Sequence, residues 1–229
     1  AEIEELAARR ALVVEAGYQR RYDPAWEEIR RLISGGALGE PIMAVSMALV
    51  RIDPRTWYYD QEASGGMPLT HLSYCYLNAM RWILGRPTVV SAMASKKVET
   101  RLERVSEETC AALVQFESGA FISATAGYVC PEGMVDAEPR FICTSGGIQA
   151  NAEGADGTVS ITVFREGGSE VRSFNNVQGS PFLRQAETFL DATEKQGEGR
   201  NPPGDALVDI QVAEAISVSA RERRTVALP

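Results

Sequence analysis

The only histidine of the chain, His71, lies in a stretch rich in side chains that can move protons. In SGGMPLTHLSYCYLNAMRWILG (residues 64–85), Tyr74, Cys75 and Asn78 follow His71 at the spacing of a helix face. Imidazole, phenol, thiol and amide would therefore converge on one pocket. A histidine with an ordinary pKa of about 6.5 suits general acid/base chemistry, and a tyrosine beside it can donate or relay a proton. The pattern predicts His71, Tyr74 and Cys75 as the catalytic group.

Each of these side chains also has a purely structural interpretation. Cysteine is among the most buried residue types, and core tyrosines usually have a hydrogen-bonded tip. A nucleophilic pair of His71 and Cys75 is disfavoured because nothing in the sequence marks an oxyanion hole or an orienting third group. A metal site on the same two residues would need distant ligands that follow no recognisable pattern, so no metal site is predicted.

Two other segments, GYQRRYDP and RIDPRTWYYD, carry groups suited to holding a substrate. Arg20 and Arg55 can make bidentate hydrogen bonds to a hydroxylated or carboxylated ligand, and Trp57 offers a flat face to an apolar ring. The alternative is surface salt bridges and a tryptophan that packs a loop. The predicted substrate-binding residues are Gln19, Arg20, Arg55, Trp57 and Asn78.

The composition limits the classes of protein to which this chain can belong. With 229 residues, 45% of them hydrophobic, the chain can bury one large core. A net charge of −8 argues against binding to nucleic acid or to an anionic membrane, which needs a concentrated basic patch. No apolar run approaches the roughly 20 residues of a membrane span, and the N-terminus lacks the pattern of a signal peptide. Four widely spaced cysteines indicate reduced thiols, and we expect a cytoplasmic protein.

The periodicity predicts an α+β fold: a large, open, mostly antiparallel sheet with helices on one face. A helix at residues 2–10 is followed by a strand-like run at 11–19, and a second helix begins at Asp23–Pro24 and ends at Gly35. Residues 64–85 are expected to form one helix. Two hairpins turn at Ser118–Gly119 and at Gly167–Gly168, and two further helices follow near the C-terminus.

The second face of the predicted sheet, which carries no helices, has to be shielded from water. Strands such as CAALVQF and FISATAGYV do not alternate cleanly with polar residues, and a large apolar face is rarely left in water. A second copy of the chain is the simplest cover, so we expect a homo-oligomer, a dimer or tetramer, built through the sheet.

The chain shows no phosphate cradle. Neither ISGGALGE nor CTSGGIQA has the G-x-G-x-x-G or Walker spacing, and neither lies between a clear strand and helix. The chain alone is therefore not expected to bind a dinucleotide.

Several segments in order resemble the C-terminal domain of the Gfo/Idh/MocA oxidoreductases, over almost the whole chain. They are EAGYQRRYDPAWEEIRRLISGGALGEPIMAV, DPRTWYYD, SGGMPLTHLSYCYLNAMRWILGRP, CAALVQFESGAFISATAGYV and SPFLRQAETFLDATEKQGEGRNPPGDALVDIQVAEAISVSARERRTV. The resemblance implies an enzyme that uses NAD or NADP on a small-molecule substrate, a sugar, cyclitol or related hydroxylated compound. It also implies a Rossmann domain ahead of this one, with an E-K-P motif, so residues 1–16 resemble the end of that domain and residues 17–229 the C-terminal domain.

The sequence departs from the family where the catalytic pair is expected. Anchoring on Gly65, Gly66 and the later Asn78 places His71 at the family's Asp position and Cys75 at its His or Tyr position. The leading hypothesis is a substrate-binding and oligomerisation domain of a dehydrogenase, inactive without its cofactor domain. The alternatives are a non-redox oligomeric binding module, and a cofactor-free lyase or isomerase that uses His71.

Overall fold

The computed structural model describes residues 2–65, 68–98, 107–131, 139–151, 157–174, 180–195 and 197–229. Its centre is one nine-stranded sheet with the strand order β8-β7-β6-β5-β1-β4-β3-β2-β9. The strands are β1 (Pro41–Leu49), β2 (Pro87–Ser95), β3 (Thr109–Phe116), β4 (Phe121–Gly127), β5 (Arg140–Cys143), β6 (Gly146–Ala150), β7 (Val159–Arg165), β8 (Gly168–Phe174) and β9 (Val226–Ala227). Strands β1 and β4 run parallel, and the other neighbouring pairs are antiparallel. The predicted α+β class and mostly antiparallel sheet are confirmed.

Both predicted hairpins form where glycine permits the turn. Gly119, between β3 and β4, has a φ of +87°, and Gly167, between β7 and β8, has a φ of +90°. Side chains other than glycine rarely adopt these values, so the two glycines set where the chain reverses.

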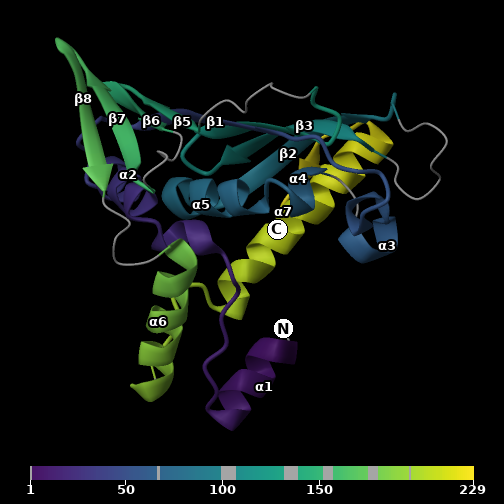
Figure 1. The fold of residues 1–229 in the computed structure, drawn as a ribbon, viewed down its shortest axis with the longest axis horizontal. Helices are drawn as coiled ribbons and strands as arrows, with labels where there is room; N and C mark the ends of the chain where they lie inside the picture. The colour runs from purple at the N-terminus through teal and green to yellow at the C-terminus, as the bar shows by residue number, and fades with distance from the viewer. Residues whose placement is uncertain are drawn as a thin grey trace.

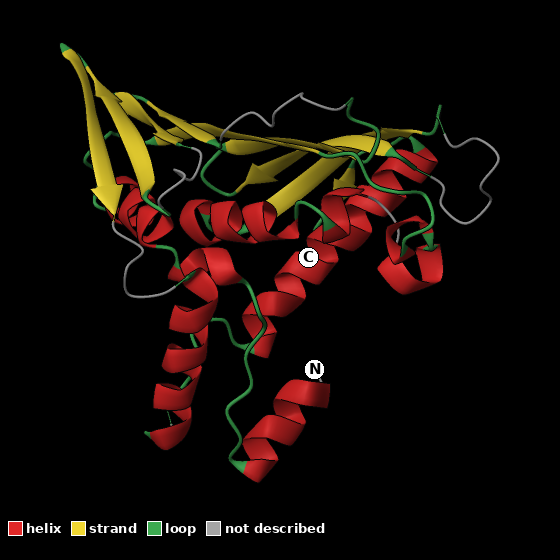
Figure 2. Ribbon diagram, viewed as in Figure 1, coloured by secondary structure: helices red, strands yellow, loops and turns green. Residues whose placement is uncertain are grey.

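The helices gather on one face of the sheet (Figure 1, Figure 2). They are α2 (Pro24–Ser34), α4 (Pro68–His71), α5 (Tyr74–Leu84) and the long α7 (Pro203–Glu222). Helix α3 (Gln61–Ser64) lies at one end, whereas α1 (Glu2–Arg10) and α6 (Pro181–Glu194) project away from the sheet. None of the helices in the described part of the chain is long and apolar enough to cross a bilayer.

The core lies between the sheet and these helices. On β3, Cys110, Ala112, Val114 and Phe116 are buried, and the alternate residues, such as Leu113, are exposed on the other face. This alternation is what a strand with one covered face shows, because successive side chains point to opposite sides.

The structure corrects two local predictions. No strand forms at residues 11–19; Ala16 N donates instead to Asn201 O at 3.0 Å, and no neighbouring strand is within reach in the described chain. Residues 64–85 do not form one helix either. Helix α4 ends at His71 and α5 begins at Tyr74. Leu72 N still makes a regular α-helical bond to Pro68 O at 2.9 Å, but Ser73 N donates to the same oxygen at 3.2 Å, one residue out of the helical register.

Candidate functional site

A short 3₁₀ helix, η1 (Gln19–Tyr22), lies against the N-terminal half of α5 and brings predicted site residues together. The Arg20 guanidinium lies over the ring of Tyr76, 5.0 Å from its centroid, and donates to the Tyr76 hydroxyl at 3.2 Å. Its positive charge also acts on the thiol of Cys75 and lowers the pKa of that thiol against the effect of burial. Gln19 lies close enough to Tyr74 to lower the pKa of its phenol against the effect of burial. Four predicted residues, Gln19, Arg20, Tyr74 and Cys75, therefore form one cluster.

A buried network of charges fixes η1 in this position. Arg21 is 2% exposed; its Nε donates to Asn78 Oδ1 at 2.8 Å, and its guanidinium pairs with Asp205 at 2.6 Å. Asn78 Nδ2 in turn donates to Asp209 Oδ2 at 2.7 Å, and Arg81 bridges both aspartates. Since the aspartates belong to α7, the network ties η1, α5 and α7 into one unit.

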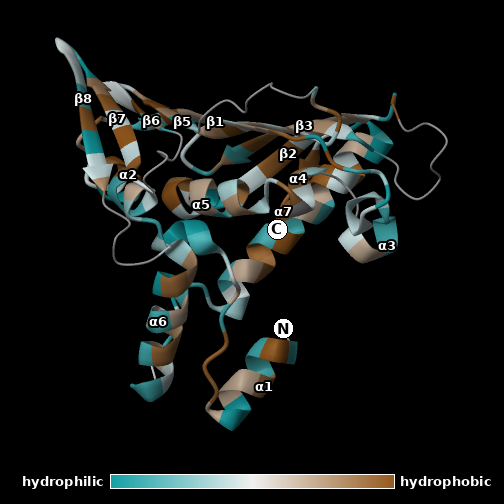
Figure 3. Ribbon diagram, in the orientation of Figure 1, coloured by the Kyte–Doolittle hydropathy of each residue, from teal (hydrophilic) through white to brown (hydrophobic). Residues whose placement is uncertain are grey.

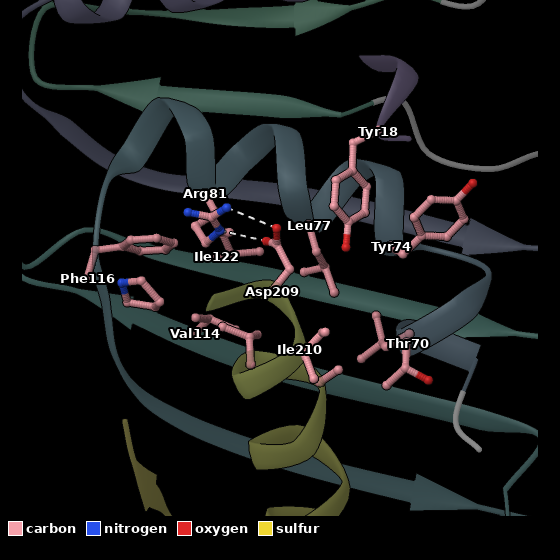
Figure 4. Close-up of a pocket in the computed structure, with 14 residues that line it drawn as sticks. Tyr18, Thr70, Tyr74, Leu77, Arg81, Val114, Phe116, Ile122, Asp209 and Ile210 are labelled. Atoms are coloured by element: carbon pink, nitrogen blue, oxygen red, sulfur yellow. Dashed lines mark hydrogen bonds and ion pairs between the residues drawn. The ribbon is translucent and has the colours of Figure 1, made fainter. Parts of the chain in front are cut away.

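A cavity of about 100 Å³ opens beside this cluster, between α5, α7 and the sheet (Figure 4). Its walls are mostly apolar side chains of α4, α5, α7, β3 and β4. The polar side chains that line it are Tyr18, Thr70, Tyr74, Arg81 and Asp209. The rings of Tyr18 and Tyr74 lie 5.8 Å apart, so Tyr74 belongs both to the cavity and to the cluster at η1.

Burial keeps the acidic groups of the cluster protonated at neutral pH. It raises the pKa of Tyr18 to about 12, and the nearby Asp209 carboxylate adds to the rise. Burial likewise raises the pKa of Tyr74 and, against the opposing charge of Arg20, that of the Cys75 thiol. Tyr74 is thus a neutral proton donor, and Cys75 is a thiol and not a reactive thiolate.

The other predicted residues have different surroundings. Asn78 is fully buried, and its amide both accepts and donates within the charge network. The Arg55 side chain is 90% exposed and pairs with Asp53 at 2.5 Å. Trp57 is half exposed and stacks on Tyr58, with ring centroids 4.4 Å apart. The cluster at η1 includes none of these three.

His71 is the last residue of α4. Its side chain lies outside the described part of the structure, as does Gly66. The break at Leu72–Ser73 changes the relation on which the sequence prediction rests, because His71 and Cys75 now belong to two helices. The acid/base role of His71 stays a prediction. Among the described residues, no three His, Cys, Asp or Glu side chains are grouped to hold a metal ion.

The fold agrees with a comparison of the sequence with protein families. A model described as the C-terminal alpha/beta domain of an oxidoreductase family, Gfo/Idh/MocA, matches residues 30–228. The chain belongs to the Gfo/Idh/MocA oxidoreductase family. Inositol 2-dehydrogenase 1 of Saccharopolyspora erythraea is 27% identical over 92% of this chain. The chain spans about 60% of the length of that relative.

Solved structures share the Gfo/Idh/MocA fold seen here. The aldose-aldose oxidoreductase of Caulobacter crescentus, complexed with glycerol, has a TM-score of 0.86 and 23% identity, over 98% of this chain and 66% of its own. A levoglucosan dehydrogenase in complex with NADH and levoglucosan has a TM-score of 0.83 and 18% identity, over 96% and 67%. At these identities the likeness shows the fold.

In this Gfo/Idh/MocA domain, the sequence prediction omitted two side chains of the site. Tyr18 lines the cavity and lies in GYQRRYDP, directly beside predicted residues. Its aromatic type was the available signal. Asp209 had none, because its contact with Asn78 joins positions 131 residues apart.

Proposed function

We propose that the protein is an NAD(P)-dependent oxidoreductase that acts on a sugar, a cyclitol or a related hydroxylated compound. In this proposal the chain supplies the substrate side. The observation that carries it is the meeting of Gln19 and Arg20 with Tyr74 at one end of α5, within the fold of this oxidoreductase family. Amide, guanidinium and phenol groups are suited to binding hydroxyl oxygens. The names of the relatives, an inositol dehydrogenase and a levoglucosan dehydrogenase, support this class of substrate.

Each side chain of the cluster has a role in this proposal. Gln19 and Arg20 hold substrate hydroxyl groups and orient the reacting carbon. His71 and Tyr74 exchange the hydroxyl proton as the alcohol and carbonyl interconvert. Cys75, kept protonated by burial, forms part of the wall. The chemistry that nicotinamide supplies when bound is transfer of the hydride.

We further propose a dinucleotide-binding domain ahead of residue 17, with residues 1–16 as its last part. One support is the length of the relatives. The other is a set of apolar residues on α1, α6 and α7 whose side chains are exposed in this chain; the ribbons of these helices carry hydrophobic (brown) segments in Figure 3. A neighbouring domain would remove this surface from water. The set is Ile3, Leu6, Phe182, Leu183, Leu190, Leu207 and Ile210.

A titration of the full-length protein with NAD(H) and NADP(H) tests the function. We expect calorimetric binding of one of them in the range of about 1 μM to 1 mM that is common for KM values. The 229-residue chain alone is the matched control and is expected to give no binding heat. If the full-length protein binds neither nucleotide, the redox function is wrong. The non-redox binding module and the lyase or isomerase that uses His71 then take its place.

We also propose that the protein forms a homo-oligomer in the cytoplasm through the open face of the sheet. Apolar side chains project from that face on neighbouring strands, and its centre pairs Met43 with Phe121 and Ile142. Leu113 is 50% exposed on β3 and Met93 is 80% exposed on β2. Four free, buried cysteines support a reducing compartment.

Replacing Leu113 with glutamate is expected to turn the dimer or tetramer into a monomer. The carboxylate would have to be buried without a partner at the centre of the contact. Light scattering coupled to size-exclusion chromatography measures the mass. Ser34→Glu, which adds a carboxylate at an exposed position of α2 on the helix side of the sheet, is the control and should leave the mass of the oligomer unchanged. A monomeric wild-type protein would contradict the proposal.

A further inference from the structure

We propose that the cavity between α5 and α7 binds a phenyl-sized apolar substituent of the substrate. This inference rests on the proposed function. It narrows the substrate class to uncharged hydroxylated compounds that carry an aryl or branched alkyl group, such as aryl glycosides.

The walls of the cavity set the chemistry of its occupant. Leu69 of α4, Leu77 of α5, Val114 and Phe116 of β3, Ile122 of β4 and Ala213 of α7 surround it. At about 100 Å³ it is far larger than a single water needs. Cavities of about 150 Å³ with walls of Leu, Ile and Phe stay dry and accept benzene. The space therefore suits an aromatic ring or a short branched chain better than a sugar ring.

The charges at the rim are already paired, so the occupant carries none. Arg81 Nε donates to Asp209 Oδ1 at 2.6 Å, and Arg81 also pairs with Asp205 at 3.0 Å. Asn78 supplies a further hydrogen bond to Asp209 at 2.7 Å. An ionic ligand would have to break this network, whereas a neutral ligand leaves it intact.

One polar group at the rim is left for the ligand. Figure 4 shows the hydroxyl of Tyr18 directed toward the cavity and that of Tyr74 directed away from it. No hydrogen bond holds the Tyr18 hydroxyl within the described part of the chain. As a neutral phenol it can donate to an oxygen that joins the apolar group to the hydroxylated part.

The cavity continues into the proposed catalytic cluster. Tyr74 lines the cavity with its ring, 5.8 Å from that of Tyr18, and Gln19 of η1 lies close enough to affect the pKa of its phenol. A ligand with its apolar group in the cavity therefore has its hydroxylated part directed toward Gln19 and Arg20. Ile210 of α7 lies at the edge of the cavity and is 53% exposed in this chain.

Calorimetric titration of the full-length protein with phenol and with benzene, without nucleotide or sugar, tests the inference. Both are expected to bind. Ala213→Leu should fill the cavity and weaken both by about tenfold to a hundredfold, the range expected for a buried apolar group. Glu214→Leu adds the same side chain at the next, exposed position of α7 and should change neither affinity.

Tyr18→Phe tests the hydroxyl separately, because it keeps the ring. Phenol should bind about three- to tenfold more weakly, the loss of one hydrogen bond, and benzene equally well. Absence of binding by the wild type, or an Ala213→Leu variant that folds and binds both as wild type does, would overturn the inference. Because these probes need no nucleotide, protein that binds NAD(H) but not phenol loses only this inference. Protein that binds phenol but not NAD(H) loses the redox function.

Discussion

Tyr74→Phe in the full-length protein is expected to lower kcat for oxidation of the accepted polyol by about 100-fold or more. General acid/base groups typically contribute about 10²- to 10⁴-fold, and the phenol is the proton-carrying group of the described cluster. Because the ring is kept, its contacts with Tyr18 are kept and KM should change by only a few-fold. Steady-state kinetics with NAD⁺ and a panel of polyols, sugars and aryl glycosides measure the effect.

Tyr22→Phe is the matched control for this change. Tyr22 lies in η1, is 1% exposed, and its buried hydroxyl has no hydrogen-bond partner in the described part of the chain. Removing that hydroxyl should leave kcat unchanged and the fold at least as stable. A Tyr74→Phe variant that keeps a third or more of the wild-type kcat would show that the phenol transfers no proton in the slow step.

The same kinetics separate Tyr74 from His71. His71→Gln removes the one imidazole of the chain, the side-chain type whose unperturbed pKa is about 6.5, so the acid limb of the pH profile of kcat should disappear. Tyr74→Phe should keep that limb and lower the whole profile, because burial holds the pKa of the phenol above its ordinary value.

The parts of the fold that could be predicted are those that local chemistry decides. Alternation of buried and exposed residues marks β3, and glycines at positive φ mark the turns at Gly119 and Gly167. The start of α2 was likewise predictable, since Asp23 accepts a hydrogen bond from Ala25 N at 2.9 Å ahead of Pro24. In each case a few adjacent residues determine the geometry.

The break between α4 and α5 could not be predicted, because tertiary contacts decide it. Neither Leu72 nor Ser73 is a helix breaker by type. Leu69 is fully buried against the sheet, and its N–H lies 3.4 Å from Cys110 Sγ of β3, which sets the direction of α4. Residues 11–19 have the apolar pattern of a strand but form none in the structure. Here the local pattern favours a strand, and the pairing with a neighbouring strand is missing from the described chain.

The candidate site likewise combines features that the local sequence predicts with features that only tertiary contacts decide. Gln19, Arg20, Tyr74 and Cys75 could be predicted because two sequence segments with suitable chemistry meet in the fold. Asn78 had equally suitable chemistry, but its amide accepts from Arg21 and donates to Asp209 of α7, so it lies within the buried charge network and outside the cluster at η1. Position in the sequence cannot distinguish these two outcomes, because the partner that decides between them lies in a distant helix.

Arg81→Met is expected to lower the free energy of unfolding by about 3–5 kcal/mol, the usual effect of breaking a buried ion pair from one side. The Arg81 side chain is 9% exposed, and its guanidinium donates to both Asp205 and Asp209. Methionine fills similar volume but leaves the Asp209 carboxylate, itself 12% exposed, with the amide of Asn78 as its remaining donor. Urea unfolding of the 229-residue chain measures the loss.

Arg86→Met is the control, because Arg86 is 61% exposed and pairs with Glu117 at the surface. It should change stability by no more than about 1 kcal/mol. In the double variant Arg81→Met/Asp209→Leu the unpaired charge is gone, so part of the loss should be recovered. If Arg81→Met behaves like Arg86→Met, the network does not hold η1 and α7 against α5. The cluster at η1 would then need another cause for its position.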